Sequence, residues 1–365
     1  MQIAEIINFL EQKAPLSLQE SYDNAGLITG SAKWECTGII VSLDATEDVI
    51  LEAKSKGCNL VVAHHPIVFS GLKKINGNNY VEKAVIASIK NDVAIYAIHT
   101  NLDNVVAGVN AKMAEKLDLI NTKILQPKPQ LLKKLFTFVP VEQAEKVRSA
   151  IFKAGGGTIG LYDECSFNVT GTGTFRASEG TNPFAGKIGE RHEEKEIKLE
   201  IIFPAWLEKS IISALIKAHP YEEVAYDIVE LDNKFQSAGA GMIGDLKQPH
   251  SAKDLLQLIK NQFNLSIIRH TPLPDKPVQK VAVCGGAGSF LTKTALAAGA
   301  DIYVTGDVKY HEFFDTENRM ILADIGHWES EQFTIELLAD WLSGKFLNFA
   351  VLKTGVKTNP VEYFS

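Results

Sequence analysis

The sequence predicts an α/β protein whose two-lobed α/β domain, with largely parallel sheets, is split along the chain by a ferredoxin-like insert. The first third alternates short apolar runs with amphipathic segments, which is the order of a parallel sheet covered by helices. The middle third has the order βαββαβ instead. From about Ser237 the first pattern resumes, so the outer segments should form one domain. The predicted boundaries are 1–128 and 234–365 for the two halves and 129–233 for the insert.

The first third supplies three buried strands separated by helices. Its N-terminal helix begins at Ile3, has apolar residues at helical spacing and stops before Pro15. The next helix follows Thr46, a capping residue with two acidic residues directly after it. The expected strands cover residues 38–43, 59–63 and 93–98, and the later helices cover residues 46–57, 81–89 and 109–119.

A proline-bearing polar stretch at residues 126–130 predicts a linker into the insert. We interpret residues 178–186 and the charged run 190–195 as an exposed loop rather than a site. The insert should contain strands at 135–139, 166–175, 196–203 and 224–230, with helices at 141–154 and 206–218. The second half should contain strands at 280–284, 301–305 and 319–323, and helices at 252–263, 290–298, 329–342 and near His311.

Composition excludes several classes of protein. The 365 residues are 45% hydrophobic and 22% charged, which is typical of a globular protein, and the net charge of -7 argues against a nucleic-acid partner. The four cysteines include no CxxC pair, so neither a disulfide framework nor a thiolate zinc site is indicated. With no basic N-terminal region and no apolar stretch near the roughly 18 residues that span a bilayer, we expect a cytoplasmic protein without a membrane partner.

The adjacent histidines His64 and His65, at the end of an apolar run and before Pro66, indicate a metal site. On an extended backbone the two rings would point in opposed directions, and each carries polar atoms that must be paired. The alternative is a pair of hydrogen-bonded core histidines. Two further clusters favour metal, since His99 with Asp103 and His327 with Glu331 also lie where a strand gives way to a loop or helix.

The candidate ligands are imidazoles and carboxylates. His327 and Glu331 are four residues apart at a helix start and can therefore bind one ion or bridge two, although a capping carboxylate with a surface histidine is the alternative. Such donors suit zinc, manganese, iron or nickel. Five donors exceed the usual needs of one catalytic ion, so two divalent ions roughly 3.5–4 Å apart are expected. The predicted ligands are His64, His65, Asp103, His327 and Glu331.

Other residues have more than one interpretation. His99 is a core residue, a partner of a metal-ligating carboxylate or a catalytic residue that contacts substrate, and His311 is a general acid or base or a surface residue. The glycine-rich segment 284–289 follows a strand, where backbone amides can hold phosphate, but close packing explains its glycines equally well. We interpret the four remaining histidines as surface residues: His192, His219, His250 and His270.

Five motifs stand out in the sequence: Ser21-Tyr-Asp-Asn-Ala-Gly-Leu27, Ala63-His-His-Pro-Ile-Val-Phe69, His99-Thr-Asn-Leu-Asp103, Gly306-Asp-Val-Lys-Tyr-His311 and Asp324-Ile-Gly-His-Trp-Glu-Ser-Glu331. Together they closely resemble the family of GTP cyclohydrolase 1 type 2 homologues, also called NGG-one-interacting-factor-three-like proteins. The insert resembles the nitrogen-regulatory-protein or copper-tolerance-protein-like domain of longer bacterial members, through segments 160–167, 171–175 and 219–224. The resemblance implies a dinuclear site at the five ligands, a toroidal homohexamer and a cytoplasmic protein.

Two functions follow from these observations. The first is a metal-dependent hydrolase acting on a nucleotide or cyclic amide, with His99 or His311 handling protons; the family name implies GTP ring opening. The second is a non-enzymatic metal-binding or regulatory protein in which the ring and its insert serve assembly or the sensing of a small-molecule ligand. A turnover assay on purified protein loaded with metal distinguishes the two.

Overall fold

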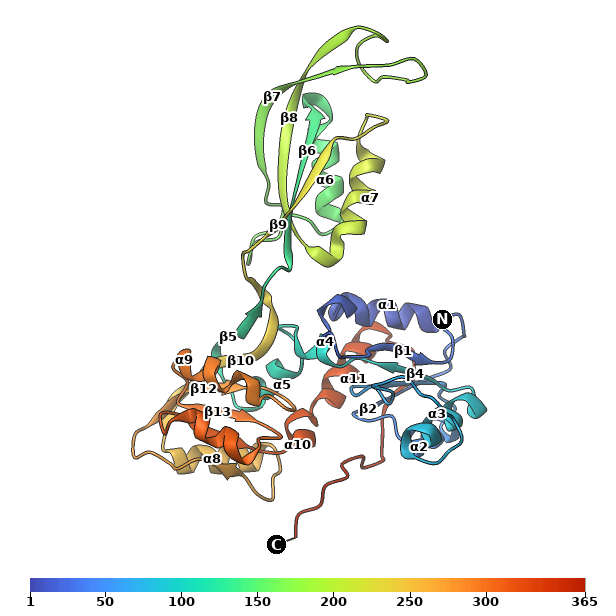
Figure 1. Ribbon diagram of the computed structural model, residues 1–365. Helices are drawn as coiled ribbons and strands as arrows, with labels where there is room; N and C mark the ends of the chain where they lie inside the picture. Colours follow the sequence, from blue (N-terminus) through green and yellow to red (C-terminus); the bar gives the residue numbers. More distant parts are fainter. Residues whose placement is uncertain (365) are drawn as a thin grey trace. The chain divides into compact units, whose positions relative to one another are not determined.

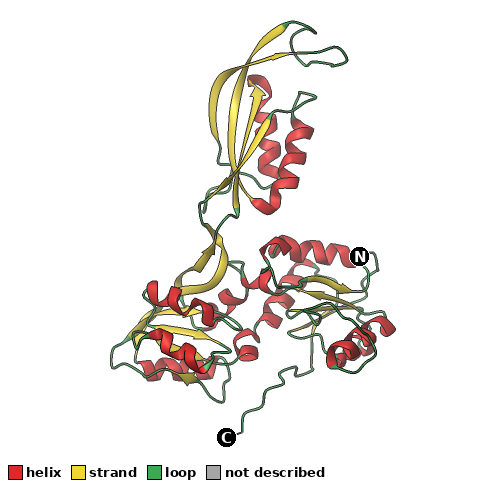
Figure 2. Cartoon of the chain, viewed as in Figure 1, coloured by secondary structure: helices red, strands yellow, loops and turns green. Residues whose placement is uncertain are grey.

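The computed structural model describes residues 1–364 (Figures 1 and 2). Two compact units are present: unit 1 combines Met1–Pro127 with the chain from Ser237 onward, and unit 2 is Lys128–Gln236. Unit 1 contains two sheets and unit 2 contains a third. No helix among the described residues is both long and apolar enough to cross a membrane.

The first sheet of unit 1 is parallel except at one edge. Its order is β1-β4-β3-β2-β15, and only the edge strand β1 runs antiparallel to its neighbour. Every residue of the three central strands is buried, as expected for strands covered on both faces. The strands are β1 (Gly26–Thr29), β2 (Ile39–Ser42), β3 (Leu60–Ala63), β4 (Ala94–Ala97) and β15 (Val351–Lys353).

Helices cover this sheet on both sides. The helices α2 (Glu47–Ser55) and α3 (Tyr80–Asn91) pack their alanine and valine side chains against one face, and α1 (Ile3–Lys13) lies on the other (Figure 1). Thr46 caps α2 as predicted, because its hydroxyl accepts a hydrogen bond from the Val49 amide. The short α4 (Thr100–Asp103) and α5 (Val109–Lys116) follow β4 and lead to the second sheet.

The second sheet of unit 1 has the order β11-β14-β13-β12-β10-β5, and its three middle strands are parallel. α5 and α8 (Ala252–Gln262) pack on one face, and α9 (Thr292–Ala297) with the 3-10 helix η5 (Tyr310–Thr316) packs on the other. Short helices η4 (Ser289–Leu291) and α10 (His327–Glu331) precede α9 and α11 (Thr334–Lys345). The strands are β5 (Ile120–Lys128), β10 (Phe235–His250), β11 (Arg269–His270), β12 (Val278–Val283), β13 (Ile302–Thr305) and β14 (Ile321–Asp324). The predicted α/β class with largely parallel sheets is therefore confirmed.

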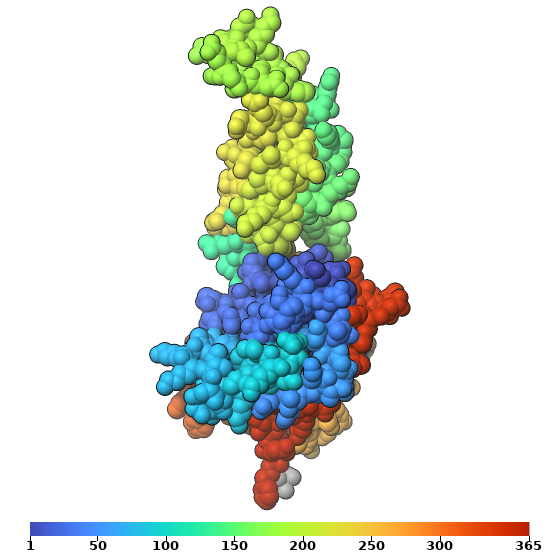
Figure 3. Space-filling model, turned by 90° about the vertical axis from the view of Figure 1, so that its right-hand side faces the viewer, coloured from blue at the N-terminus to red at the C-terminus, as the bar shows by residue number. Residues whose placement is uncertain are grey.

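Unit 2 has the predicted element order βαββαβ. Its sheet is antiparallel throughout, in the order β7-β8-β6-β9, and both helices pack on one face around Leu135, Leu199 and Ile211. The outer part of the β7–β8 hairpin projects as a lobe from the rest of this unit (Figure 3). The elements are β6 (Leu132–Pro140), α6 (Ala144–Lys153), β7 (Phe167–Arg176), β8 (Arg191–Pro204), α7 (Glu208–Ala218) and β9 (Tyr226–Leu231).

Several local predictions were wrong. The predicted linker at residues 126–130 is partly strand, because β5 continues to Lys128; an edge strand tolerates Pro127, which cannot donate a hydrogen bond. The charged run is not a loop either, since β8 begins at Arg191 and its backbone pairs with β7 whatever its side chains are. The last predicted helix is two helices, α10 and α11, and the short strands β1 and β15 were missed.

Candidate metal centre

The candidate ligands come together where the carboxyl ends of both unit 1 sheets open into one cavity of about 1020 Å³. His64 and His65 directly follow β3, Asp103 ends α4, and His327 and Glu331 are the first and last residues of α10. Three overlapping groups of side chains are close enough to hold an ion. Two of them share Glu331: His64 with Asp103 and Glu331, and His65 with His327 and Glu331; the third joins His64, His65 and His99. Parallel strands thus place residues from distant segments at one edge.

The paired histidines converge rather than diverge. We expected their rings to point in opposed directions, but the chain bends directly after Ala63, and the two ring centroids are 4.9 Å apart. His64 is fully buried. The expectation was wrong because strand alternation holds only while the backbone remains extended.

Glu331 faces both groups with different oxygens. Its Oε2 lies 3.0 Å from His65 Nε2 and 3.2 Å from His327 Nε2, while its Oε1 lies 3.7 Å from His64 Nε2. Tetrahedral ligands roughly 2.0–2.2 Å from one ion are separated by about 3.3–3.6 Å. The three distances lie within about 0.3 Å of that range, so small side-chain shifts would let these atoms bind a metal ion. The i, i+4 spacing on α10 explains why His327 and Glu331 meet.

Two buried polar atoms at the centre lack hydrogen-bond partners among the described residues. They are His64 Nε2 and Asp103 Oδ1, which lie 3.7 Å apart. His64 Nδ1 donates to the Ile98 carbonyl, so in the neutral ring Nε2 is an acceptor that faces another acceptor. A cation between them would satisfy both, and the donor set therefore fits a divalent ion.

Burial and charge oppose one another at these groups. Burial raises the pKa of the Asp103 carboxyl well above its ordinary value, and the negative charge of Glu331 raises it further. Burial lowers the pKa of His64. Burial acts to lower the pKa of His65 as well, but hydrogen bonds to Asp44 and Glu331 outweigh burial and raise that pKa to about 10. Ligand oxygens of the buried Glu331 and the partly buried Asp103 lie within 4.8 Å of one another, so the two carboxylates need positive charge nearby, which histidines or metal ions can supply.

Carboxylate oxygens accept hydrogen bonds from the Nδ1 atoms of His65 and His327, so the Nε2 atoms of both rings face the centre of the site. Asp44 Oδ1 accepts from His65 Nδ1 at 2.8 Å, and Asp307 Oδ2 accepts from His327 Nδ1 at 2.7 Å. Such partners fix the tautomer and orientation of metal-ligating histidines. The sequence analysis did not predict Asp44 or Asp307 as a partner of a ligand histidine, because no spacing in the sequence links either residue to its histidine.

His99 lines the same cavity and lies beside the paired histidines. Its ring centroid is 5.3 Å from that of His64, and its Nδ1 lies 2.8 Å from Asp23 Oδ1. Burial opposes ionisation of Asp23, but hydrogen bonds from His99 and Thr100 outweigh it and lower the pKa of Asp23 to about 2. A charged Asp23 therefore orients the imidazole of His99.

The glycine-rich segment after β12 makes room for Glu331. A Cβ on Gly286, which has φ +65°, would clash with Glu331 Oε1. Its amides are already bonded: Gly285 N donates to Asn110 Oδ1, and Gly286 N donates to Ser330 Oγ. Of the two interpretations left open, close packing accounts for these glycines.

The other histidines lie elsewhere. His311 is exposed on η5, packs against the rings of Tyr310 and Phe314 and does not line the cavity. The prediction that His219 is a surface residue was wrong: it is buried inside unit 2, where its Nε2 donates a hydrogen bond to the Phe138 carbonyl.

The rest of the cavity is aromatic and acidic. Tyr22, Phe69, Phe290 and Trp328 line it, and Arg269 is the one lysine or arginine among the described lining residues. Arg269 is itself paired with Asp324 Oδ2 at 3.0 Å. The cavity thus offers apolar ring faces, carboxylates and few basic groups.

Comparisons with known proteins agree with this architecture. The family described as Duf34/NIF3 (NGG1p interacting factor 3) matches residues 1–360. A Bacillus subtilis protein named GTP cyclohydrolase 1 type 2 homolog is 36% identical over 364 residues, 98% of each chain. A solved Bacillus cereus protein related to NIF3 is 37% identical with a TM-score of 0.88 over 100% of this chain and 99% of that one. A solved Staphylococcus aureus protein is 27% identical, with a TM-score of 0.78 over 100% of this chain and 99% of that one.

Proposed function

Since the chain belongs to the Duf34/NIF3 family, we propose that its unit 1 cavity is a dinuclear metal centre that hydrolyses a nucleotide or cyclic amide. The observation that carries the metal site is the unpartnered pair at its centre, His64 Nε2 facing Asp103 Oδ1 at 3.7 Å. Burying two acceptors against one another is costly unless a metal ion or a proton lies between them, and the raised pKa of Asp103 reflects that need for positive charge.

The proposal of two ions rests on Glu331. Its Oε1 faces His64 and its Oε2 faces His65 and His327, so the carboxylate joins both groups of donors. The donors are imidazole and carboxylate, which suit zinc, manganese, iron or nickel rather than a thiolate-selective metal. Ions in such a centre polarise a carbonyl or phosphoryl oxygen and lower the pKa of water.

The chain's own residues orient the ligand histidines and provide a group, His99, that can exchange a proton with substrate. Asp44 and Asp307 fix two ligand histidines, and Asp23 holds His99 Nδ1, leaving His99 Nε2 to exchange a proton with substrate. We propose His99 as the catalytic acid or base. His311 lies outside the lining and takes no part in this scheme.

The lining favours recognition of a flat ring over recognition of a triphosphate. Tyr22, Phe69 and Trp328 offer faces on which a nucleobase or cyclic amide can stack, whereas Arg269 is already paired with Asp324. Phosphate binding would therefore depend on the metal ions. We accordingly expect nucleosides and free cyclic amides to be accepted at least as well as GTP.

Elemental analysis tests the metal centre. The His65→Ala and Glu331→Ala variants should lose metal while retaining the far-ultraviolet circular dichroism of the parent. His311→Ala is the matched control, because its exposed ring lies outside the cavity. A full metal complement in both ligand variants would refute the centre.

A turnover assay tests the hydrolase. Metal-loaded protein is incubated with GTP, guanosine and a panel of cyclic amides, and products are resolved by chromatography. Turnover should require metal and fall in a His99→Gln variant that still binds metal. Metal binding without turnover of any compound would favour the alternative, a non-enzymatic metal-binding or regulatory protein.

We also propose a homohexamer in the cytoplasm, on the strength of the family resemblance. The four cysteines are free thiols in the described chain, which suits a reducing compartment. Neither proposal is needed for the metal centre, whose donors all come from one chain.

A further inference from the structure

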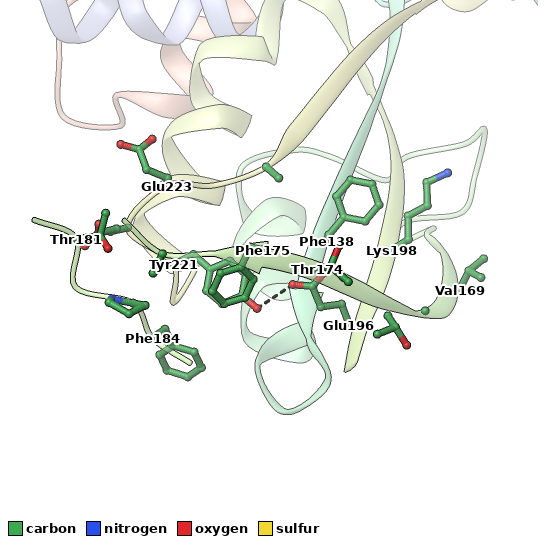
Figure 4. A pocket seen from close by; sticks show the side chains of 17 residues that line it. Phe138, Val169, Thr174, Phe175, Thr181, Phe184, Glu196, Lys198, Tyr221 and Glu223 are labelled. Atoms are coloured by element: carbon green, nitrogen blue, oxygen red, sulfur yellow. Dashed lines mark hydrogen bonds between the residues drawn. The ribbon is translucent and has the colours of Figure 1, made fainter. Parts of the chain in front are cut away.

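A second cavity lies in unit 2, on the face of the sheet opposite the helices (Figure 4). Its volume is about 620 Å³, within the usual range of roughly 300–1,000 Å³ for small-molecule sites. Strand alternation explains its position, because Leu135 and Val139 pack under the helices while Phe138 points to the opposite face. The loops 177–184 and 221–225 contribute its remaining walls.

Aromatic rings surround this cavity. The ring of Tyr221 lies 6.0 Å, centroid to centroid, from that of Phe175 and from that of Phe184, and Phe138 adds a fourth ring. Figure 4 shows Tyr221 and Phe184 on one side and Phe138 on the other. A ligand body that enters here meets ring faces, whose quadrupole is negative at the centre.

One buried carboxylate lies among these rings. Glu196 is only 8% exposed, and its Oε1 accepts a hydrogen bond of 2.8 Å from Tyr221 Oη. Burial raises the pKa of Tyr221, and the hydrogen bond to Glu196 raises it further, so the hydroxyl remains a donor. A carboxylate has about four acceptor positions, and Glu196 can therefore accept further hydrogen bonds from a ligand.

Two glycines of β7 shape the cavity beside that carboxylate. A Cβ on Gly173 would clash with Glu196 Oε2, so glycine is required there. A Cβ on Gly171 would meet nothing within 4 Å, so this glycine leaves open space. The motif Gly171-Thr-Gly-Thr-Phe175 therefore gives the cavity its depth.

The charges around the cavity favour a cation. Glu222 and Glu223 line it together with Glu196. Lys198 also lines it, but its Nζ donates to Glu200 Oε1 at 2.9 Å and lies 4.4 Å from the centre of the Phe136 ring. The ammonium of Lys198 is thus directed to Glu200 rather than to Glu196.

We propose that this cavity binds a small molecule that carries a protonated amine on an aromatic or aliphatic body. The ammonium donates to Glu196 and lies against the ring faces of Tyr221 and Phe175, which combines a charge-assisted hydrogen bond with cation–π attraction. The apolar body fills the space above Gly171. This site is independent of the metal centre, since all its residues belong to unit 2.

Calorimetric titration of the full chain with 2-phenylethylammonium tests the proposal. Neutral 2-phenylethanol has nearly the same shape and should bind about tenfold or more weakly, because it lacks the charge. One amine should bind per chain. Glu196→Gln should remove most of the preference for the amine, and Glu193→Gln, an equal change of charge at an exposed position on the other face of β8, should leave it unchanged.

A second variant fills the cavity. Gly171→Leu places its side chain in open space, so the fold should be retained while amine binding is lost. The proposal is overturned if amine and alcohol bind wild-type protein equally, or if amine binding survives both Glu196→Gln and Gly171→Leu. It is also overturned if wild-type protein binds no amine and Gly171→Leu lowers the oligomeric mass, since the cavity would then be a contact between copies.

Discussion

Replacing Asp103 by asparagine should have opposite effects on the stability of the metal-free and the metal-loaded protein. Without metal, Asp103 Oδ1 and His64 Nε2 are two buried acceptors 3.7 Å apart, and neither has a partner among the described residues. An asparagine amide can donate to His64 Nε2 at every pH, whereas the Asp103 carboxyl can donate only while it is protonated, which its raised pKa favours. The substitution therefore satisfies the buried pair and removes a negative charge from beside Glu331 wherever Asp103 would be ionised, so its effect is largest at a pH above the pKa of Asp103.

The size of the stability change follows from the free-energy cost of buried polar groups that lack hydrogen-bond partners. Each unsatisfied buried polar group costs about 1–3 kcal/mol, so the metal-free variant should gain roughly that amount. Each kcal/mol corresponds to about 2–4 °C in Tm for a unit of this size, which predicts a rise of roughly 2–12 °C. Wild-type protein should in turn gain about 2.7 kcal/mol from metal at a concentration one hundred times its Kd. The variant should lose most of that gain, because a neutral amide is a poorer ligand.

Thermal unfolding in a chelator and in excess zinc or manganese measures both effects. Asp118→Asn is the matched control: Asp118 is 83% exposed in its side chain and has φ +53°, a conformation that asparagine adopts readily. A variant that is less stable than the parent in chelator, or that gains as much from metal as the parent, would refute the reasoning.

Three further outcomes are expected. Asp44→Asn should weaken metal binding about 10–100-fold without abolishing it, because the acceptor of His65 Nδ1 is altered but the ligands remain. A competitive chelator titration measures the affinity, and an unchanged value would contradict the role of Asp44 in orienting His65. Replacement of residues 129–233 by a short Gly/Ser linker should give a folded, metal-loaded protein, since every proposed ligand lies in unit 1; an insoluble or metal-free product would contradict an autonomous insert. Light scattering after size exclusion should give about six times the chain mass of 40.0 kDa, and a monomer at micromolar concentration would exclude the ring.

Sequence alone predicted the α/β class and the candidate metal ligands that the fold brings together. Strands such as β3 could be predicted because burial on both faces demands an unbroken apolar run, and His64 and His65 could be placed at its carboxyl end. The i, i+4 pair of His327 and Glu331 was likewise readable, because helical spacing sets which side chains meet. These features depend on residues close together in the chain.

Tertiary structure decided how those residues act together. The bend after Ala63 turns both rings inward, and Asp23 reaches His99 across 76 residues of sequence. Glu331 meets His65 across 266 residues, and no local pattern encodes which of its oxygens faces which histidine. His311, predicted at the site from its place in the chain, lies outside the lining. Side-chain direction and hydrogen-bond partners at strand ends are set by the packing of distant segments, so only the folded chain determines them.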